Sequence, residues 1–160
     1  MANFVIGDLW DSLGKNDLVF VTTNGFIKND GCLVMGRGAA KDATFKYPDV
    51  ARNCGMFLTQ GNFSINSIRV SSKQYLVYGA TLIPYYDTFG IFQVKYVWWE
   101  QADRGLISLS TDMLTEIANR YSDVKVRLNF PGIGNGGLSK EVVLPIVSRL
   151  PKNVFIYTKD

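Results

Sequence analysis

Short apolar segments alternate with amphipathic segments along most of this 160-residue chain, and this alternation is what most restricts its fold. The segment LVFVTT (18–23) is apolar and β-branched, as expected of a buried strand. Residues 100–121 carry apolar side chains at helical spacing, with polar residues on the other face. Because alternating strands and helices build parallel sheets covered by helices, the sequence predicts an α/β sandwich with a largely parallel sheet.

The remaining elements are predicted from the same patterns. Further strands are expected at residues 2–6, 67–70, 75–83, 89–96, 124–130 and 153–159. Further helices are expected at residues 36–49, 49–57 and 138–150, the last with Ser139 as its N-cap. The polar residues between the strands at 67–70 and 75–83 predict a hairpin, and such connections would make the sheet mixed. No repeat or linker interrupts the pattern, so one domain spanning residues 1–160 is expected.

The composition excludes several kinds of chemistry and partner. The chain has no histidine, which removes Ser-His-Asp catalysis, Cys-His catalysis and histidine metal ligands. Cys32 and Cys54 are too few for a disulfide framework or a zinc site, and no metal or cofactor is expected. The 17 basic and 14 acidic residues are dispersed, which argues against a nucleic-acid partner. No apolar run is long enough to span a membrane and the start MANFVIGD lacks signal-peptide features, so a cytoplasmic location is expected.

Two glycine-rich segments each follow a predicted strand and lead into a predicted helix. They are GCLVMGRGAA (31–40) and FPGIGNGGLS (130–139). In open α/β sheets ligands bind at such strand-to-helix turns. Glycine lets the backbone approach a ligand closely, and a helix N-terminus adds partial positive charge. The pair therefore predicts two phosphate-binding loops; the alternative is that the glycines only form tight turns.

The second segment also matches the dinucleotide-binding pattern G-x-G-x-x-G through Gly132, Gly134 and Gly137. In a Rossmann fold an acidic residue follows this pattern by about 20 positions. Tyr157 stands at that spacing here, and no second βαβ half follows it. The context therefore does not support the dinucleotide interpretation.

Four short motifs now stand in a recognisable order: Gly7-Asp8-Leu9, DLVFVTTN (17–24), MGRGAA (35–40) and PGIGNGGL (131–138). With these motifs the sequence resembles the macro domain, the ADP-ribose-binding α/β/α module, in the short form found in phages and bacteria. The resemblance covers nearly the whole chain. It implies a three-layer α/β/α sandwich with a mixed, largely parallel sheet.

The resemblance also implies which residues hold the ligand. Asp8 would accept hydrogen bonds from the adenine amino group, Asn24 would contact the distal ribose, and the family's first asparagine is replaced by Val21. The alternatives are a helix cap for Asp8 and a turn residue beside Gly25 for Asn24. Arg37 is alternatively a solvated surface residue, and Tyr157 a packing residue of the last strand. The full implied ligand-binding set is Asp8, Leu9, Asn24, Gly36, Arg37, Gly38, Ala39, Gly132, Ile133, Gly134, Asn135, Gly136, Gly137, Leu138 and Tyr157.

Three residues are candidates for catalysis. Lys95 occupies the place of the lysine that one macro-domain subgroup uses, and it can attack an anomeric carbon only if burial lowers its pKa; the alternative is a surface lysine at a strand end. Asn24 can instead position a water molecule near the distal ribose. Asp30 is a candidate base because it precedes the first loop. The subgroup's catalytic aspartate is absent, since residues 138–140 carry no carboxylate and Glu141 lies one turn further on.

Three functions follow from these residues. The first is binding of ADP-ribose with hydrolysis of a derivative, such as ADP-ribose 1″-phosphate or an ADP-ribosyl adduct. The second is a reader of ADP-ribose or a nucleotide that performs no catalysis. The third is a nucleic-acid-binding module, which would need a basic face with exposed aromatic residues. The dispersed charges argue against the third, and Trp98 and Trp99 are interpreted as packing residues rather than a base-stacking platform.

Overall fold

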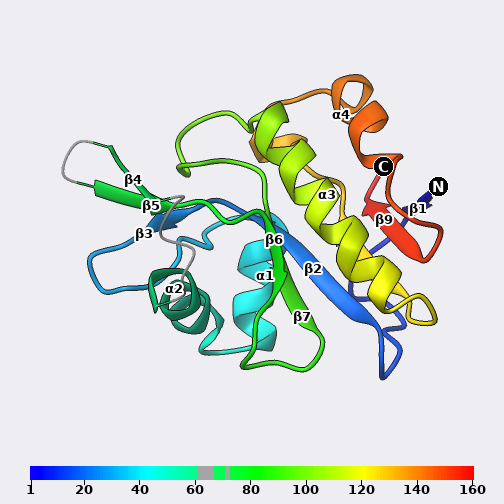
Figure 1. Ribbon diagram of the computed structural model, residues 1–160, viewed down its shortest axis with the longest axis horizontal. Coiled ribbons are helices and arrows are strands. Elements are labelled where there is room, and N and C mark those ends of the chain that lie inside the picture. Colours follow the sequence, from blue (N-terminus) through cyan, green and yellow to red (C-terminus); the bar gives the residue numbers. More distant parts are fainter. Residues whose placement is uncertain (61–66, 71–72) are drawn as a thin grey trace.

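Six strands form the central sheet of the computed structural model, which describes residues 1–60, 67–70 and 73–160 (Figure 1). Every neighbouring pair is parallel except the last pair, which is antiparallel. The sheet is therefore mixed and largely parallel, as the sequence predicted. In spatial order the strands are β1 (Asn3–Ile6), β9 (Val154–Thr158), β8 (Val126–Asn129), β2 (Leu18–Thr23), β7 (Phe89–Gln93) and β6 (Ala80–Leu82).

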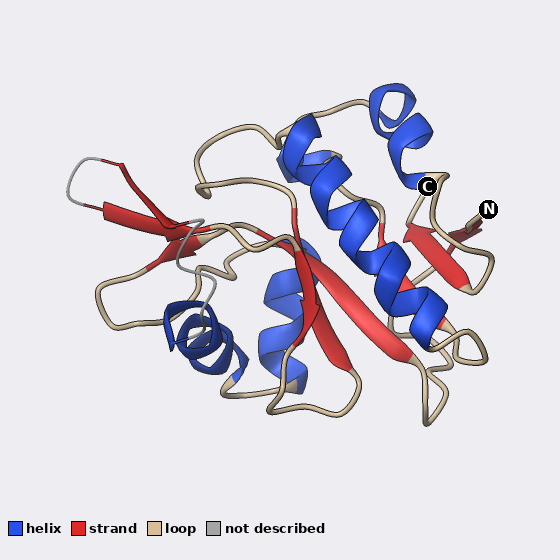
Figure 2. Cartoon of the chain, viewed as in Figure 1, coloured by secondary structure: helices blue, strands red, loops and turns tan. Residues whose placement is uncertain are grey.

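Helices cover both faces of this sheet (Figure 2). In β2, Leu18 and Phe20 pack towards α3 (Arg104–Arg120) and α4 (Lys140–Val147). The intervening Val19 and Val21 pack towards α1 (Gly38–Lys46) and α2 (Val50–Gln60). Successive strand residues point to opposite faces, so an apolar run such as this one is buried on both. The result is the predicted three-layer α/β/α sandwich.

A second, smaller sheet lies beside the first. Its order is β3 (Phe26–Ile27), β5 (Lys73–Leu76) and β4 (Ser67–Val70), with antiparallel pairing throughout. The antiparallel pairing of β4 with β5 confirms the predicted hairpin, although its turn at 71–72 lies outside the described residues. The short β3 was not predicted from the sequence.

The prediction of one strand over residues 75–83 is wrong. Its first part belongs to β5 in the small sheet and its last part to β6 in the large sheet. Between them Gly79 has a φ of 119°, a conformation that favours glycine. The buried Gln93 side chain accepts hydrogen bonds from the backbone N–H groups of Tyr78, at 2.6 Å, and of Gly79, at 2.8 Å. These bonds replace ladder bonds, and the chain crosses from one sheet to the other.

Side-chain N-caps fix where α3 and α4 begin. Ser139 caps α4 by accepting a hydrogen bond from the backbone N–H of Val142, as predicted. Asp103 caps α3 in the same way, with a 2.8 Å bond from the Leu106 N–H, so this helix starts later than the sequence suggested. Of the helices in the described part of the chain, none has both the length and the apolar character needed to cross a membrane.

Candidate functional site

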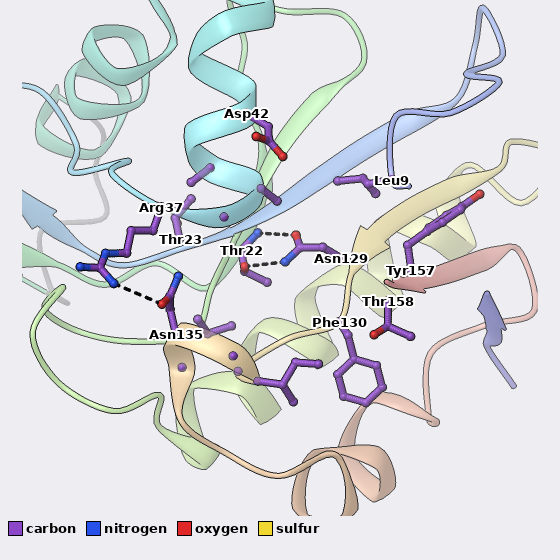
Figure 3. A pocket seen from close by; sticks show the side chains of 18 of the residues that line it. Leu9, Thr22, Thr23, Arg37, Asp42, Asn129, Phe130, Asn135, Tyr157 and Thr158 are labelled. Carbon is purple, nitrogen blue, oxygen red and sulfur yellow. Dashed lines mark hydrogen bonds between the residues drawn. The ribbon is translucent and has the colours of Figure 1, made fainter. Parts of the chain in front are cut away.

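A cleft of about 1030 Å³ opens at the carboxyl-terminal ends of the parallel strands (Figure 3). Residues at or just beyond the ends of β1, β2, β7, β8 and β9 line it. Both glycine-rich loops line it too, the first through Gly36–Ala40 and the second through Gly132–Gly136 and Leu138. Two segments separated by about 90 positions in the sequence therefore face one space, because β2 and β8 are neighbours in the sheet.

The first loop ends at the N-terminus of α1. Gly38, the first residue of this helix, has a φ of 61°, which favours glycine over other residues. The first backbone N–H groups of a helix have no partner within it, and they carry partial positive charge. At Gly36 an added Cβ would meet no heavy atom within 4 Å, so the backbone there borders open space. The first loop therefore places the N-terminus of α1 beside the cleft.

The glycines of the second loop serve different purposes. Gly134 begins the 3-10 helix η2 (Gly134–Gly136) with a φ of 63°, and a Cβ there would meet open space. Gly132 has a φ of 78°, and its Cβ would stand 2.7 Å from the Ile107 Cδ1 atom. Gly137 does not line the cleft; its N–H donates to the Gly134 carbonyl at 2.9 Å and closes the turn. Only part of the glycine cluster therefore lines the cleft.

Two cations lie where the loops approach each other. The Arg37 Nη1 atom donates to the Asn135 Oδ1 atom at 3.5 Å, and this hydrogen bond joins the two loops across the cleft (Figure 3). The Lys95 Nζ atom donates to the Asn135 carbonyl at 3.0 Å. Partial burial, together with the nearby Arg37 charge, lowers the pKa of Lys95 from 10.5. This end of the cleft is positive and contains an amine that loses its proton more readily than an ordinary lysine.

The opposite end of the cleft is formed by the segment after β1 and by the end of β9. Asp8 is exposed, and its Oδ1 atom accepts a 2.9 Å hydrogen bond from the Trp10 N–H. No helix follows Asp8 in the described residues 9–17, so the helix-cap role considered as its alternative is wrong; the bond belongs to a turn over residues 9–12, and it leaves carboxylate lone pairs for another donor. Leu9 and Tyr157 are buried residues of the same wall.

The floor of the cleft contains a polar pair that the sequence did not single out. The Asn129 Oδ1 atom accepts a hydrogen bond from the Thr22 N–H at 2.9 Å, and its Nδ2 atom donates to the Thr22 Oγ1 atom at 2.8 Å (Figure 3). The threonine hydroxyl keeps its own hydrogen for another acceptor. Both residues lie at the ends of neighbouring parallel strands, which is the signal that could have identified them.

Asn24 lines the cleft but uses its side chain within the protein. Its Oδ1 atom accepts from the Phe26 N–H at 2.8 Å, and its Nδ2 atom donates to the Val34 carbonyl at 3.2 Å. These bonds tie the end of β2 to the segment that leads into the first glycine loop. One amide hydrogen remains for a ligand.

Asp30 is not among the residues that line the cleft. It is exposed on a turn with Gly31, whose φ is 88°. The hydrogen bond from the Cys32 N–H, at 3.0 Å, lowers the pKa of the Asp30 carboxyl below 3.8. A carboxylate with a lowered pKa is a poorer base, so neither its position nor its chemistry supports the catalytic role considered for it.

Two tryptophans stand at the mouth of the cleft. Trp98 and Trp99 line it while remaining 53% and 51% exposed. Trp99 packs against Phe26 with ring centroids 5.4 Å apart, and Trp98 against Trp99 at the same distance. The packing expected of these residues is present, but it covers only part of each indole.

Comparison with solved structures places this architecture among the macrodomains. The macrodomain of Mycobacterium tuberculosis DarG matches with a TM-score of 0.65 and 20% identity, over 100% of this chain and 99% of that chain. The macrodomain of Thermus aquaticus DarG matches with a TM-score of 0.65 and 21% identity, over 100% and 98%. Thermosipho africanus DarTG in complex with ADP-ribose matches with a TM-score of 0.64 and 22% identity, over 97% of this chain and 41% of that chain.

These matches show that the chain has the macrodomain fold. They are structural likenesses, since no protein-family model and no curated protein sequence matches the chain. The fold that the four sequence motifs predicted is therefore confirmed, and the cleft described above is at the carboxyl ends of its parallel strands.

Proposed function

We propose that this protein binds ADP-ribose or an ADP-ribose derivative in the cleft. The observation that carries the proposal is the convergence of both glycine loops on one space of about 1030 Å³. Backbone N–H groups from the first turn of α1 and from η2 would bind the pyrophosphate, and Arg37 would add a charge-assisted bond. A solved structure with the same fold, Thermosipho africanus DarTG, is in complex with ADP-ribose.

The polar residues of the cleft suggest how the ligand is oriented. The exposed Asp8 carboxylate accepts hydrogen bonds, which suits the exocyclic amino group of adenine, and Tyr157 offers an apolar surface beside it. With the pyrophosphate between the loops, the distal ribose then lies towards Asn24 and Lys95. The remaining amide hydrogen of Asn24 is a donor for a ribose hydroxyl.

Calorimetric titration with ADP-ribose, ADP, AMP and ribose 5-phosphate tests this proposal. We expect ADP-ribose to bind most tightly, because it alone fills both ends of the cleft and both phosphate positions. ADP should bind more weakly, and AMP and ribose 5-phosphate more weakly still. Equal affinity for AMP and ADP-ribose, or no heat with ADP-ribose at millimolar concentration, would contradict the proposal.

We further propose that Lys95 gives the protein a hydrolytic activity on ADP-ribose derivatives. The neutral amine of Lys95 attacks the anomeric carbon of the distal ribose, and the bond to the attached group breaks. The electron pair leaves with that group, which takes the proton released by the amine. Water then cleaves the ribosyl–lysine bond, giving free ADP-ribose and restoring the amine. The lowered pKa of Lys95, caused by partial burial and by Arg37, supports this role.

The substitution Lys95→Met is expected to lower hydrolysis at least about a hundredfold, which is the scale of losing an essential catalytic group, while ADP-ribose still binds. In the unsubstituted protein the rate should rise with pH and level off below the ordinary lysine pKa of 10.5, because only the neutral amine attacks. Release of ADP-ribose from its 1″-phosphate, from an ADP-ribosylated peptide and from an ADP-ribosylated oligonucleotide is the measurement.

Lys152→Met, on the exposed turn between α4 and β9 and not among the cleft-lining residues, is the matched control and should leave the rate unchanged. A Lys95→Met protein that hydrolyses normally would remove the lysine mechanism.

A reader without catalysis is the second candidate function, and two observations favour it. Asp30 lies outside the cleft lining, and the Asn24 amide is engaged by Phe26 and Val34. If the titration shows ADP-ribose binding while all three substrates stay intact after prolonged incubation, the reader is the correct function.

A further inference from the structure

Arg127 is a buried charge behind the wall of the cleft that Asp8 and Leu9 form. It lies on β8, its side chain is 2% exposed, and it is not among the cleft-lining residues. Its Nε atom pairs with the Asp17 Oδ2 atom at 3.0 Å. An isolated buried charge is strongly destabilising, so this pairing is what allows the guanidinium to be there.

The other donors of Arg127 go to the segment after β1. The Nη1 atom donates to the carbonyls of Leu9, at 3.0 Å, and Asp11, at 2.6 Å. The Nη2 atom donates to the Ser12 carbonyl at 2.8 Å. A guanidinium has five N–H donors; one binds Asp17, and three hold one stretch of irregular backbone, residues 9–12, in place.

This stretch depends on those bonds for its shape. It contains no regular secondary structure, and Ser12 has a φ of 52°, an uncommon conformation for a residue other than glycine. Within it the Asp8 carbonyl accepts the Asp11 N–H at 3.1 Å, and the Asp8 side chain accepts the Trp10 N–H. Fixing the carbonyls of Leu9, Asp11 and Ser12 therefore also fixes where the Asp8 carboxylate points.

The guanidinium supports a second part of the same wall. Its Cζ atom lies 5.3 Å from the centre of the Tyr157 ring, a distance typical of a cation–π contact. Tyr157 lines the cleft on the side opposite to the glycine loops. One buried residue thus contacts both components of this end of the cleft.

We propose that Arg127 is the positioning residue that sets base specificity, by holding Asp8 where it distinguishes an adenine amino group from other substituents. This inference rests on the proposed binding of ADP-ribose. Arg127 touches no ligand itself. Its effect is on discrimination between bases, because the carbonyls that it binds belong to residues 9–12 and not to either phosphate-binding loop.

The test compares ADP-ribose with its hypoxanthine analogue, in which an oxo group replaces the 6-amino group. The unsubstituted protein should prefer ADP-ribose about tenfold, the scale of one hydrogen bond to a charged group. In Arg127→Lys the preference should fall to about twofold or less, because the competent conformation of the segment is less populated. Lysine keeps a charge beside Asp17 but cannot reach three carbonyls in the fork geometry of arginine.

Arg149→Lys is the matched control, since Arg149 is half-exposed after the end of α4 and is not among the cleft-lining residues. This variant should prefer ADP-ribose over the hypoxanthine analogue by the same factor as the unsubstituted protein. If Arg127→Lys does not fold, Asp17→Asn loosens the same network by removing the negative charge that pairs with Arg127, and an intermediate preference for ADP-ribose is expected. In Arg127→Lys, the backbone amides of residues 9–12 should lose protection against hydrogen exchange, while the protection of the β2 amides stays unchanged.

The outcomes separate the inference from the proposed function. An unsubstituted protein that does not bind ADP-ribose overturns the function. Binding without a preference between the two ligands, or an equal loss of affinity for both in Arg127→Lys, overturns the inference alone, because an equal loss is what a merely structural role produces.

Discussion

The Gly36→Val protein is expected to fold normally and to bind ADP-ribose about a hundredfold more weakly. An added Cβ at Gly36 meets no heavy atom within 4 Å, and the residue does not have a positive φ, so the folded structure tolerates a side chain there. The same open space is the cleft in which the pyrophosphate is proposed to lie. Displacing the phosphate from two charge-assisted hydrogen bonds, each contributing about 1.5 kcal/mol, corresponds to roughly a hundredfold change in affinity.

Titration calorimetry with ADP-ribose measures this effect, and the melting temperature checks the fold. Gly36→Ala provides a graded control, since its single methyl group projects less far and should weaken binding by a smaller factor. Unchanged affinity in Gly36→Val, with an unchanged melting temperature, would show that the first loop does not hold the phosphate.

Phe20→Ala is expected to lower the free energy of unfolding by about 3–5 kcal/mol, the range for removing a buried aromatic side chain. Phe20 is 0% exposed in the centre of β2 and packs in the core beneath α3 and α4. The neighbouring Gly90, on which the Phe20 ring packs closely, has no side chain that could fill the space. Truncation therefore leaves a cavity at the middle of the sheet.

Urea denaturation followed by circular dichroism provides the measurement. Phe45→Ala is the matched control, since Phe45 is 76% exposed on α1 and its removal should change the free energy by less than about 0.5 kcal/mol. A loss below about 1 kcal/mol in Phe20→Ala would contradict the packing described for this face of the sheet.

The fold was predictable because its signals are local. The apolar run at 18–23 and the helical spacing at 100–121 each follow from side-chain period alone, and both elements are present. The error at 75–83 has a non-local cause, since Gln93, which diverts the chain there, lies on another strand. Hydrophobic pattern cannot show that a buried side chain from elsewhere will take over ladder hydrogen bonds.

In the candidate site, too, the features with a local sequence signal were predictable and those that depend on strand pairing were not. The two glycine loops could be recognised because a strand, a glycine turn and a helix start are consecutive in the sequence. The pair of Thr22 and Asn129 could not, because it joins residues 107 positions apart through the adjacency of β2 and β8. Asp30 was selected for its nearness in sequence to the first loop, but the turn at Gly31 carries it outside the cleft lining.

The position of β1 has a consequence for how the cleft is assembled. β1 lies at the edge of the large sheet and pairs there with β9, so the first strand of the described chain docks against the last. Such pairings have high contact order and close slowly. The wall at 7–12 is complete only when β9 pairs with β1 and Arg127 of β8 binds the carbonyls of residues 9–12. Recovery of the proposed base recognition during refolding should therefore lag behind recovery of helical circular dichroism.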